Sequence, residues 1–168
     1  MKLYIVGSVA SGKSTLARRI SKITGIPCYH LDEVMHIVDL NEVNGNRRRS
    51  VEERDALFAD ILAEDNYIIE DVGRECFAEG MRMADTVILL DIPIYILRKR
   101  IILRWIKQNL DIEKCKYKPN FGMLKNMFRW AKNYDAESYI APYHDKTVII
   151  RNNKDLKQYL NKLKLNGK

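Results

Sequence analysis

The segment with the clearest chemical character is a glycine- and serine-rich stretch near the amino terminus, Gly7-Ser8-Val9-Ala10-Ser11-Gly12-Lys13-Ser14. It follows the pattern Gly-x-x-x-x-Gly-Lys-Ser of a phosphate-binding loop, or P-loop. In such a loop the backbone N–H groups point inward at the positive end of a helix, where they bind phosphate oxygens. Lys13 would reach the outer phosphates, and the Ser14 hydroxyl would ligate Mg²⁺. Residues Gly7–Thr15 therefore predict a binding site for ATP with Mg²⁺.

The residues on either side of this loop have the patterns of a strand and a helix, in the order that the motif requires. Leu3-Tyr4-Ile5-Val6 is a short apolar run typical of a buried parallel strand. After the loop, apolar residues recur at helical spacing at positions 16, 20 and 23. This context favours a functional loop over a chance glycine-serine turn.

The rest of the chain alternates between short apolar runs and segments with helical periodicity. Strands are predicted over residues 28–31, 67–69, 86–90 and 146–150. Helices are predicted over residues 51–63, 75–83, 94–108, 121–134 and 155–165, and a loop over residues 39–49. The alternation predicts a three-layer α/β P-loop fold, with about five parallel strands and helices on both faces of the sheet.

The same patterns predict how single side chains are used. Ser50 and Glu53 form a capping box at the start of a helix. Five apolar residues are expected on the inner side of that helix: Val51, Leu57, Phe58, Ile61 and Leu62. The aromatic residues of 121–134 are expected to face the core rather than to stack on bases. His36 is interpreted as a packing or capping residue.

Carboxylates follow several of the predicted strands, and ligands in doubly wound sheets bind beyond the carboxyl ends of strands. Asp32 could accept a proton from a substrate hydroxyl, hold a magnesium-bound water, or cap the helix that follows it. Glu70, Asp71 and Asp91 are the candidates for positioning Mg²⁺, and Glu70 is favoured over Asp71. Asp91 could equally cap the next helix.

Positive charge is concentrated in one part of the chain. Residues 1–93 carry a net charge of −5, whereas residues 94–134 carry +9. This distribution favours a polyanionic ligand, either nucleotide phosphates or nucleic acid, although a solvated helix face would have the same composition. Arg47-Arg48-Arg49 could clamp the phosphate of a second substrate or form a solvated cluster.

Length and composition limit the class of protein. The chain of 168 residues has the size of one domain, and no apolar run approaches the roughly 20 residues that span a bilayer. Three widely spaced cysteines, at positions 28, 76 and 115, form the pattern of neither a disulfide framework nor a zinc site. We therefore expect a cytoplasmic protein without a membrane partner; the oligomeric state cannot be predicted.

Several residues together resemble the adenylate kinases, in the nucleoside-monophosphate-kinase branch of P-loop proteins. Those enzymes carry an aspartate and, four residues later, an arginine at the end of their third strand; Glu70 and Arg74 repeat that spacing. Asp91-Ile92-Pro93 matches their Asp-x-Pro strand end, and Arg100 and Arg104 match the two lid arginines that follow it.

This resemblance implies roles for residues outside the P-loop. It implies that Arg100 and Arg104 contact the nucleotide, and that Arg74 binds substrate. The loop after the last strand cradles the adenine in that family, which would place Asn152 and Asn153 in the nucleotide site.

The chain also resembles the bacterial DNA topology modulation protein family, which is itself adenylate-kinase-like. The similarity lies in His30-Leu31-Asp32, in the strand end at Leu90 to Pro93 and in the helix around Trp130. The chain departs from that family after the third strand, where Glu70-Asp71-Val72 stands in place of Asp-Gly-Asn. Segment 109–120 also lacks the cysteines of a zinc-bearing lid, because Cys115 stands alone.

Two functions follow as hypotheses. The first is a small-molecule or nucleotide kinase formed by one domain, 1–168, with an acceptor-side segment at about 32–66 and a basic lid-like segment at about 105–140. Lys13 and the two lid arginines would neutralise the transferring phosphoryl group, and Asp32 would orient the acceptor. The second is a nucleotide-binding, DNA-associated regulatory protein with weak or no kinase activity. A regulatory GTPase is disfavoured, because Asn153-Lys154-Asp155 lacks the intervening residue of a guanine-specificity motif.

Overall fold

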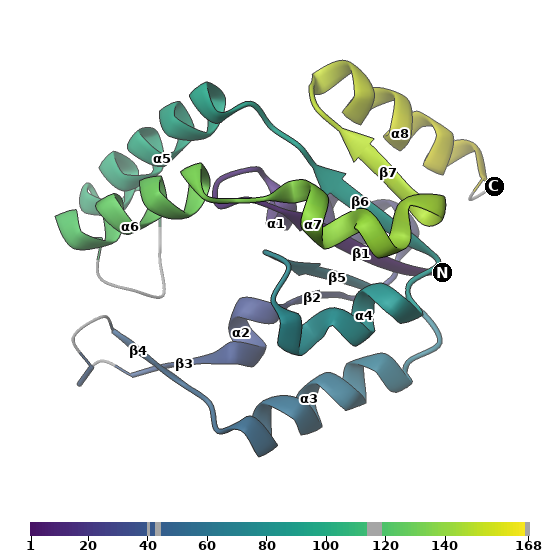
Figure 1. The fold of residues 1–168 in the computed structure, drawn as a ribbon, viewed down its shortest axis with the longest axis horizontal. Helices are drawn as coiled ribbons and strands as arrows, with labels where there is room; N and C mark the ends of the chain where they lie inside the picture. The colour runs from purple at the N-terminus through teal and green to yellow at the C-terminus, as the bar shows by residue number, and fades with distance from the viewer. Residues whose placement is uncertain (40, 43–44, 114–118, 167–168) are drawn as a thin grey trace.

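The computed structural model of the protein describes residues 1–39, 41–42, 45–113 and 119–166 (Figure 1). Cys115 and part of the segment predicted as lid-like, 105–140, lie outside the described residues. Cys28 and Cys76 are free thiols. None of the described helices has the length and apolar character needed to cross a membrane.

A five-stranded parallel sheet forms the centre of the molecule, with the strand order β2-β5-β1-β6-β7. Its strands are β1 (Lys2–Gly7), β2 (Cys28–His30), β5 (Tyr67–Asp71), β6 (Thr86–Leu90) and β7 (Thr147–Ile150). The first strand therefore lies in the middle, between β5 and β6. This order confirms the predicted α/β fold with five parallel strands.

Helices cover both faces of the sheet (Figure 1). On one face lie α1 (Lys13–Thr24) and α8 (Asn153–Asn166). On the other lie α2 (Leu31–Met35), α3 (Val51–Ala63), α4 (Ala78–Met83) and α7 (Ala136–Ile140), with the 3-10 turns η1 (Glu75–Phe77) and η2 (Ala141–Lys146). Side chains of β1 alternate between the two cores: Tyr4 and Val6 point to one, Leu3 and Ile5 to the other. The buried strand thus holds the P-loop between two packed layers.

The start of α3 confirms the predicted capping box. Ser50 Oγ accepts from the Glu53 backbone N–H at 3.2 Å, and the Glu53 side chain accepts from the Ser50 N–H. The predicted inner side of α3 is confirmed for Phe58, Ile61 and Leu62, which are buried in the core. It was wrong for Val51, which lies in the first turn, and for Leu57, since both are exposed.

A two-stranded antiparallel hairpin, β3 (His36–Val38) and β4 (Asn46–Arg48), stands outside the main sheet. Predicting a loop over 39–49 was therefore wrong for residues 46–48. Strands of three residues with mostly polar side chains carry too few positions to show an alternating pattern. The hairpin leads from α2 to α3 and forms one edge of the opening described below (Figure 1).

Two long helices, α5 (Ile94–Asn109) and α6 (Phe121–Lys132), pack side by side and share a small core of their own (Figure 1). That core consists of Leu97, Ile101, Met127 and Ala131. The aromatic residues of α6 do not all face it, contrary to expectation: Phe121 is 76% exposed and Trp130 49%. Phe121 instead lies against Trp105 of α5, with ring centroids 5.0 Å apart.

The core over α4 leaves no room for a side chain at Gly80. A methyl group there would lie 2.8 Å from Tyr4 Cε2 and 3.0 Å from Phe58 Cζ, both on rings held in the core. Gly80→Ala should therefore lower the free energy of unfolding by about 1–3 kcal/mol, despite the better helix propensity of alanine. Urea unfolding would measure the change. Gly122→Ala, on the exposed side of α6, is the matched control; a Gly80→Ala variant as stable as wild type would contradict the packing described here.

Candidate active site

The predicted P-loop connects β1 directly to α1. Gly12 has a φ of +103° and occupies the position before the helix, where no side chain caps the first turn. The first backbone N–H groups of a helix have no acceptor within the helix itself. At Gly7, an added methyl group would lie 3.0 Å from Leu90 O and from Ser11 Oγ. The loop is therefore tightly folded and leaves the positive end of α1 open to an anion.

Two serine hydroxyls inside the loop test whether these residues fit a polyphosphate. Ser8 Oγ and Ser11 Oγ are buried, and neither has a hydrogen-bond partner in the described part of the chain. Buried hydroxyls are normally bonded, so these two lack partners that phosphate oxygens could supply. The loop residues therefore fit the phosphate chain of a nucleotide.

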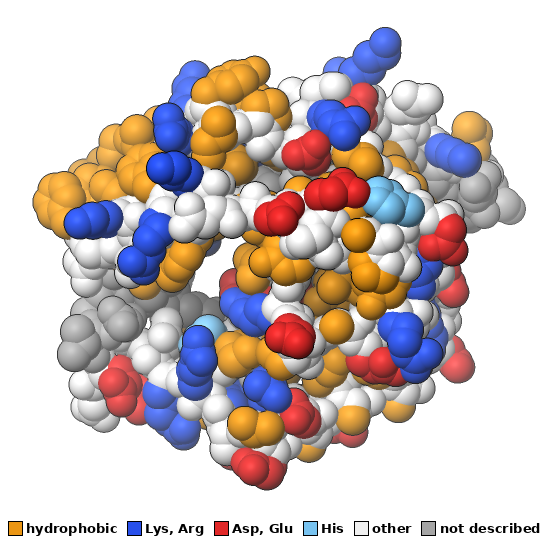
Figure 2. Space-filling model, viewed as in Figure 1, with side chains coloured by type: hydrophobic (Ala, Val, Ile, Leu, Met, Phe, Trp, Pro, Cys, Tyr) orange, Lys and Arg blue, Asp and Glu red, His pale blue; other side chains and the backbone are white. Residues whose placement is uncertain are grey.

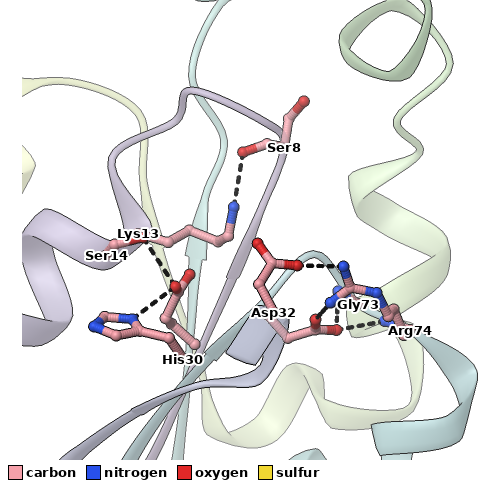
Figure 3. Close-up of polar contacts among 9 residues, drawn as sticks. Ser8, Lys13, Ser14, His30, Asp32, Gly73 and Arg74 are labelled. Carbon is pink, nitrogen blue, oxygen red and sulfur yellow. Dashed lines mark hydrogen bonds and ion pairs between the residues drawn. The ribbon is translucent and has the colours of Figure 1, made fainter. Parts of the chain in front are cut away.

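Lys13 lies folded across the loop (Figure 3). Its ammonium group donates a hydrogen bond to the Ser8 carbonyl oxygen at 3.0 Å. Burial lowers the pKa of Lys13, while the nearby carboxylates of Glu70 and Asp32 act in the opposite direction. The bond to Ser8 is the one hydrogen bond of the ammonium group within the described structure, so a short rotation of the side chain would bring it to a bound phosphate.

The Ser14 hydroxyl lies against the carboxylate at the end of β5. It donates to Glu70 Oε1 at 2.9 Å, and His30 Nδ1 lies 2.8 Å from the same oxygen (Figure 3). Hydroxyl and carboxylate oxygens suit Mg²⁺, which keeps most of its ligands as water and substrate phosphate. The described residues contain no group of three or more His, Cys, Asp and Glu side chains arranged to hold a metal. Ser14 and Glu70 therefore fit a cation that arrives with a nucleotide.

The other two carboxylates considered for Mg²⁺ have different contacts. Asp71 Oδ2 accepts from the backbone N–H groups of Gly73 and Arg74, at 2.7 and 2.6 Å. Asp91 Oδ2 accepts from Arg151 Nε at 3.0 Å, and no side chain caps α5, so the capping role considered for Asp91 is not seen. Of the three carboxylates, Glu70 is the one bonded to Ser14.

Arg74 joins two carboxylates, one that lines the cleft and one that is buried (Figure 3). Its guanidinium group donates to both Asp32 and Asp71. The protein around Asp32 disfavours its charged form, but the Arg74 guanidinium outweighs this and holds the pKa of Asp32 below its ordinary value. The Asp32 side chain is 67% exposed, so its carboxylate remains open to a ligand. Asp32 lies in the first turn of α2, not at its cap, which is His30.

The remaining predicted residues reach the opposite side of the loop. Arg100 Nη1 donates to the carbonyl oxygen of Ser11 at 2.8 Å and to that of Ala10 at 3.4 Å. Arg104, one turn further along α5, pairs with Glu113 at 3.1 Å. Asn152 Oδ1 accepts from two N–H groups at the start of α8, and Asn153 is the first residue of that helix.

A single open cleft of about 1160 Å³ brings these groups together. Fourteen of the predicted site residues line it, and Gly7 and Ser8 do not: Val9, Ala10, Ser11, Gly12, Lys13, Ser14, Thr15, Asp32, Glu70, Arg74, Arg100, Arg104, Asn152 and Asn153. Figure 2 shows the hollow in the surface with Lys and Arg side chains along its rim.

The cleft also contains residues to which the sequence analysis gave no definite role in the site. They include His36, Arg48, Trp130 and Tyr139. His36 was interpreted as a packing or capping residue. Which of Arg47, Arg48 and Arg49 faces the cleft depends on how the hairpin pairs. The one signal in the sequence would have been an alternating pattern over residues 46–48, and three residues are too few to show it.

Comparison with known proteins agrees with this geometry. Residues 3–116, more than half of the chain, match the protein family described as an AAA domain. The chain belongs to this AAA-domain family. No curated protein sequence matches it significantly.

Solved structures show which fold this AAA-domain protein shares. It superposes on the shikimate kinase of Aquifex aeolicus vf5 with a TM-score of 0.55 and 19% identity, covering 99% of this chain and 98% of that one. A gluconokinase from Sinorhizobium meliloti 1021 gives a TM-score of 0.58 at 12% identity, with 99% and 90% covered. The shikimate kinase of Acinetobacter baumannii, solved with shikimate, gives 0.56 at 17% identity, with 99% and 93% covered. The protein therefore has the fold of P-loop kinases over its whole length.

Proposed function

We propose that this protein is an ATP-dependent phosphotransferase that acts on a small acceptor, a nucleotide or another compound with a hydroxyl or phosphate group. The observation that carries the proposal is the cleft, which the P-loop and Asp32 both line. The neighbouring structures support it, because they are a shikimate kinase and a gluconokinase, which phosphorylate small hydroxylated molecules.

In the proposed reaction, an oxygen of the acceptor forms a bond to the γ-phosphorus while the bond from that phosphorus to the β,γ-bridging oxygen breaks. Asp32 orients the acceptor hydroxyl and accepts its proton. Lys13 and the N–H groups of the loop hold the phosphates, and Arg100 and Arg104 neutralise charge on the transferring group. Ser14 and Glu70 would hold Mg²⁺, which supplies charge neutralisation between the β- and γ-phosphates. Such catalysis is mainly positioning and charge stabilisation, so the cations count for more than a strong base.

The residues that line the cleft suggest how the domain is divided between its substrates. We propose that residues 32–66, which include most of α2 and the β3–β4 hairpin, serve the acceptor, with Arg74 anchoring Asp32 beside it. Residues 105–140, which include α6, would close over the nucleotide from the side of Arg104. Asn152 and Asn153 would lie beside the adenine.

The experiment is an assay of acceptor-dependent ADP release. Purified protein with ATP and Mg²⁺ should release ADP in the presence of at least one compound in a panel of nucleoside monophosphates, sugars, sugar acids and polyols. ATP should also raise the melting temperature of the protein, because a ligand that binds the folded state stabilises it. ATP binding without acceptor-dependent release across a broad panel would count against the kinase.

The alternative is a nucleotide-binding, DNA-associated regulatory protein, as membership of the topology modulation family would imply. Two observations favour it: the charge of +9 over residues 94–134, and the exposure of Phe121 and Trp130 on the same helices. DNA affinity should then fall steeply as salt rises, by about 10³-fold between 50 and 200 mM if at least six phosphates are contacted. The absence of DNA binding at low salt would exclude this function. For either function we propose a cytoplasmic protein, because the cysteines show no disulfide pattern.

A further inference from the structure

The β3–β4 hairpin presents one pair of side chains to the cleft. His36 and Arg48 lie directly opposite each other in the antiparallel ladder, as do Ile37 and Arg47. Neighbouring residues of a strand point to opposite sides, so the two pairs face in opposite directions. His36 and Arg48 line the cleft, whereas Arg47 pairs with Asp39 at 3.7 Å outside it.

The charges around this pair do not cancel. Arg74 is neutralised by Asp32 and Asp71, and it in turn occupies part of the Asp32 carboxylate. Arg48 forms no ion pair with any residue that the structure describes. Burial and the guanidinium groups of Arg74 and Arg48 lower the pKa of His36 and outweigh the opposite effect of Asp32. A neutral imidazole can donate a hydrogen bond while Arg48 supplies an unbalanced positive charge.

The position of the pair relative to Asp32 sets the size of the ligand. The N–H of His36 donates to the carbonyl oxygen of Asp32 at the end of α2, so the two residues are one helical turn apart. The helix ends at His36, which has extended backbone angles, and Asp32, His36 and Arg48 line the same cleft. A molecule of a few carbon atoms can therefore contact Asp32 at one end and the hairpin at the other.

Building on the proposed function, we propose that His36 and Arg48 bind an anionic group of the phosphoryl acceptor while Asp32 holds its hydroxyl group. The acceptor is then a small hydroxylated anion, bearing either a carboxylate or a phosphate. This subsite would make the enzyme prefer an anionic acceptor over its neutral counterpart, because a neutral acceptor would leave the positive charge of Arg48 without a partner.

The test compares matched acceptors and matched arginine variants. The acceptors are glycerate and glycerol, gluconate and glucose, glucose 6-phosphate and glucose, and AMP and adenosine, so that carboxylate and phosphate are examined separately. The wild-type protein should use an anionic member of these pairs in preference to the neutral one. Arg48→Gln should raise the KM for that anion about 10- to 100-fold with a smaller change in kcat, because a hydrogen-bonded charge contact is lost. Arg47→Gln should leave both constants unchanged.

A binding measurement keeps this inference separate from the proposed reaction. Calorimetry with gluconate and glucose 6-phosphate should detect binding to wild type that is weakened by Arg48→Gln and by His36→Gln but not by Arg47→Gln. Transfer to neutral acceptors as efficient as to anions, or equal losses in the Arg47 and Arg48 variants, would overturn the subsite and leave the kinase standing. Anion binding that depends on Arg48, without any phosphoryl transfer, would overturn the kinase and leave the subsite standing.

Discussion

Replacing Lys13 by alanine should reduce phosphoryl transfer by about 10²- to 10³-fold, the loss typical of removing one donor that stabilises charge in a transition state. The ammonium group is buried at the base of the cleft and bonded only to the Ser8 carbonyl oxygen in the described structure. It is therefore available to a phosphate without breaking an ion pair. The rate of ADP release at saturating acceptor would measure the loss.

The control for this variant lies in the same helix. Lys22→Ala removes an exposed lysine from the last turn of α1 and should leave the rate unchanged. Since burial lowers the pKa of Lys13, the folded state gains little from its charge, and Lys13→Ala should unfold at a temperature close to wild type. A folded Lys13→Ala protein with full activity would show that the P-loop does not serve catalysis.

Asp32→Asn should lower kcat by about 10²-fold, the lower end of the contribution of a positioned general base, because the cations supply most of the catalysis. The amide keeps the shape of the side chain but cannot take the hydroxyl proton of the acceptor. ATP binding should be retained, because Asp32 is not part of the P-loop and contacts Arg74. Glu33→Gln, the adjacent exposed acid on α2, is the matched control and should keep the wild-type kcat.

The same variant has a signature in the pH dependence of stability. The folded-state pKa of Asp32 lies below its ordinary value of 3.8, with Arg74 as the favourable partner. The unfolded state therefore takes up the proton first, so the ion pair stabilises the protein fully above about pH 4 and less as the pH falls through the folded pKa. The melting-temperature difference between wild type and Asp32→Asn should be constant from pH 5 to 8 and shrink in stronger acid. A difference that grows on acidification would contradict the pairing.

Much of the fold was predictable because its signals are local. The apolar runs of β1, β5 and β6 and the Ser50–Glu53 capping box each lie within a few residues, and each formed as expected. The hairpin and the short helical segments α7 and η2 were missed. Their three to six residues are too few for a period to appear, and their conformation is fixed by contacts with distant elements.

The candidate site was likewise predictable where its residues are adjacent in sequence, and not where residues distant in sequence meet. The P-loop is contiguous in sequence, so its spacing alone predicted the bend that the structure contains. The contacts of Glu70 with His30, and of Arg74 with Asp32, join residues 40 and 42 positions apart, so no local pattern encodes them. Arg48 lines the cleft because of the side of the three-residue strand β4 on which it lies. That side is fixed by the pairing of β4 with β3 and cannot be read from the neighbouring sequence.

Helix α5 is attached to the P-loop, so a change in the conformation of the loop should affect the helix. Val9 and Ala10 pack against the small core between α5 and α6, and Arg100 donates hydrogen bonds to carbonyl oxygens of the same loop, those of Ala10 and Ser11. Any ligand that reshapes this turn must also disturb the helical pair, whose interior is small and stands apart from the two larger ones. The positions of α5 and α6 should therefore depend on whether a nucleotide occupies the loop.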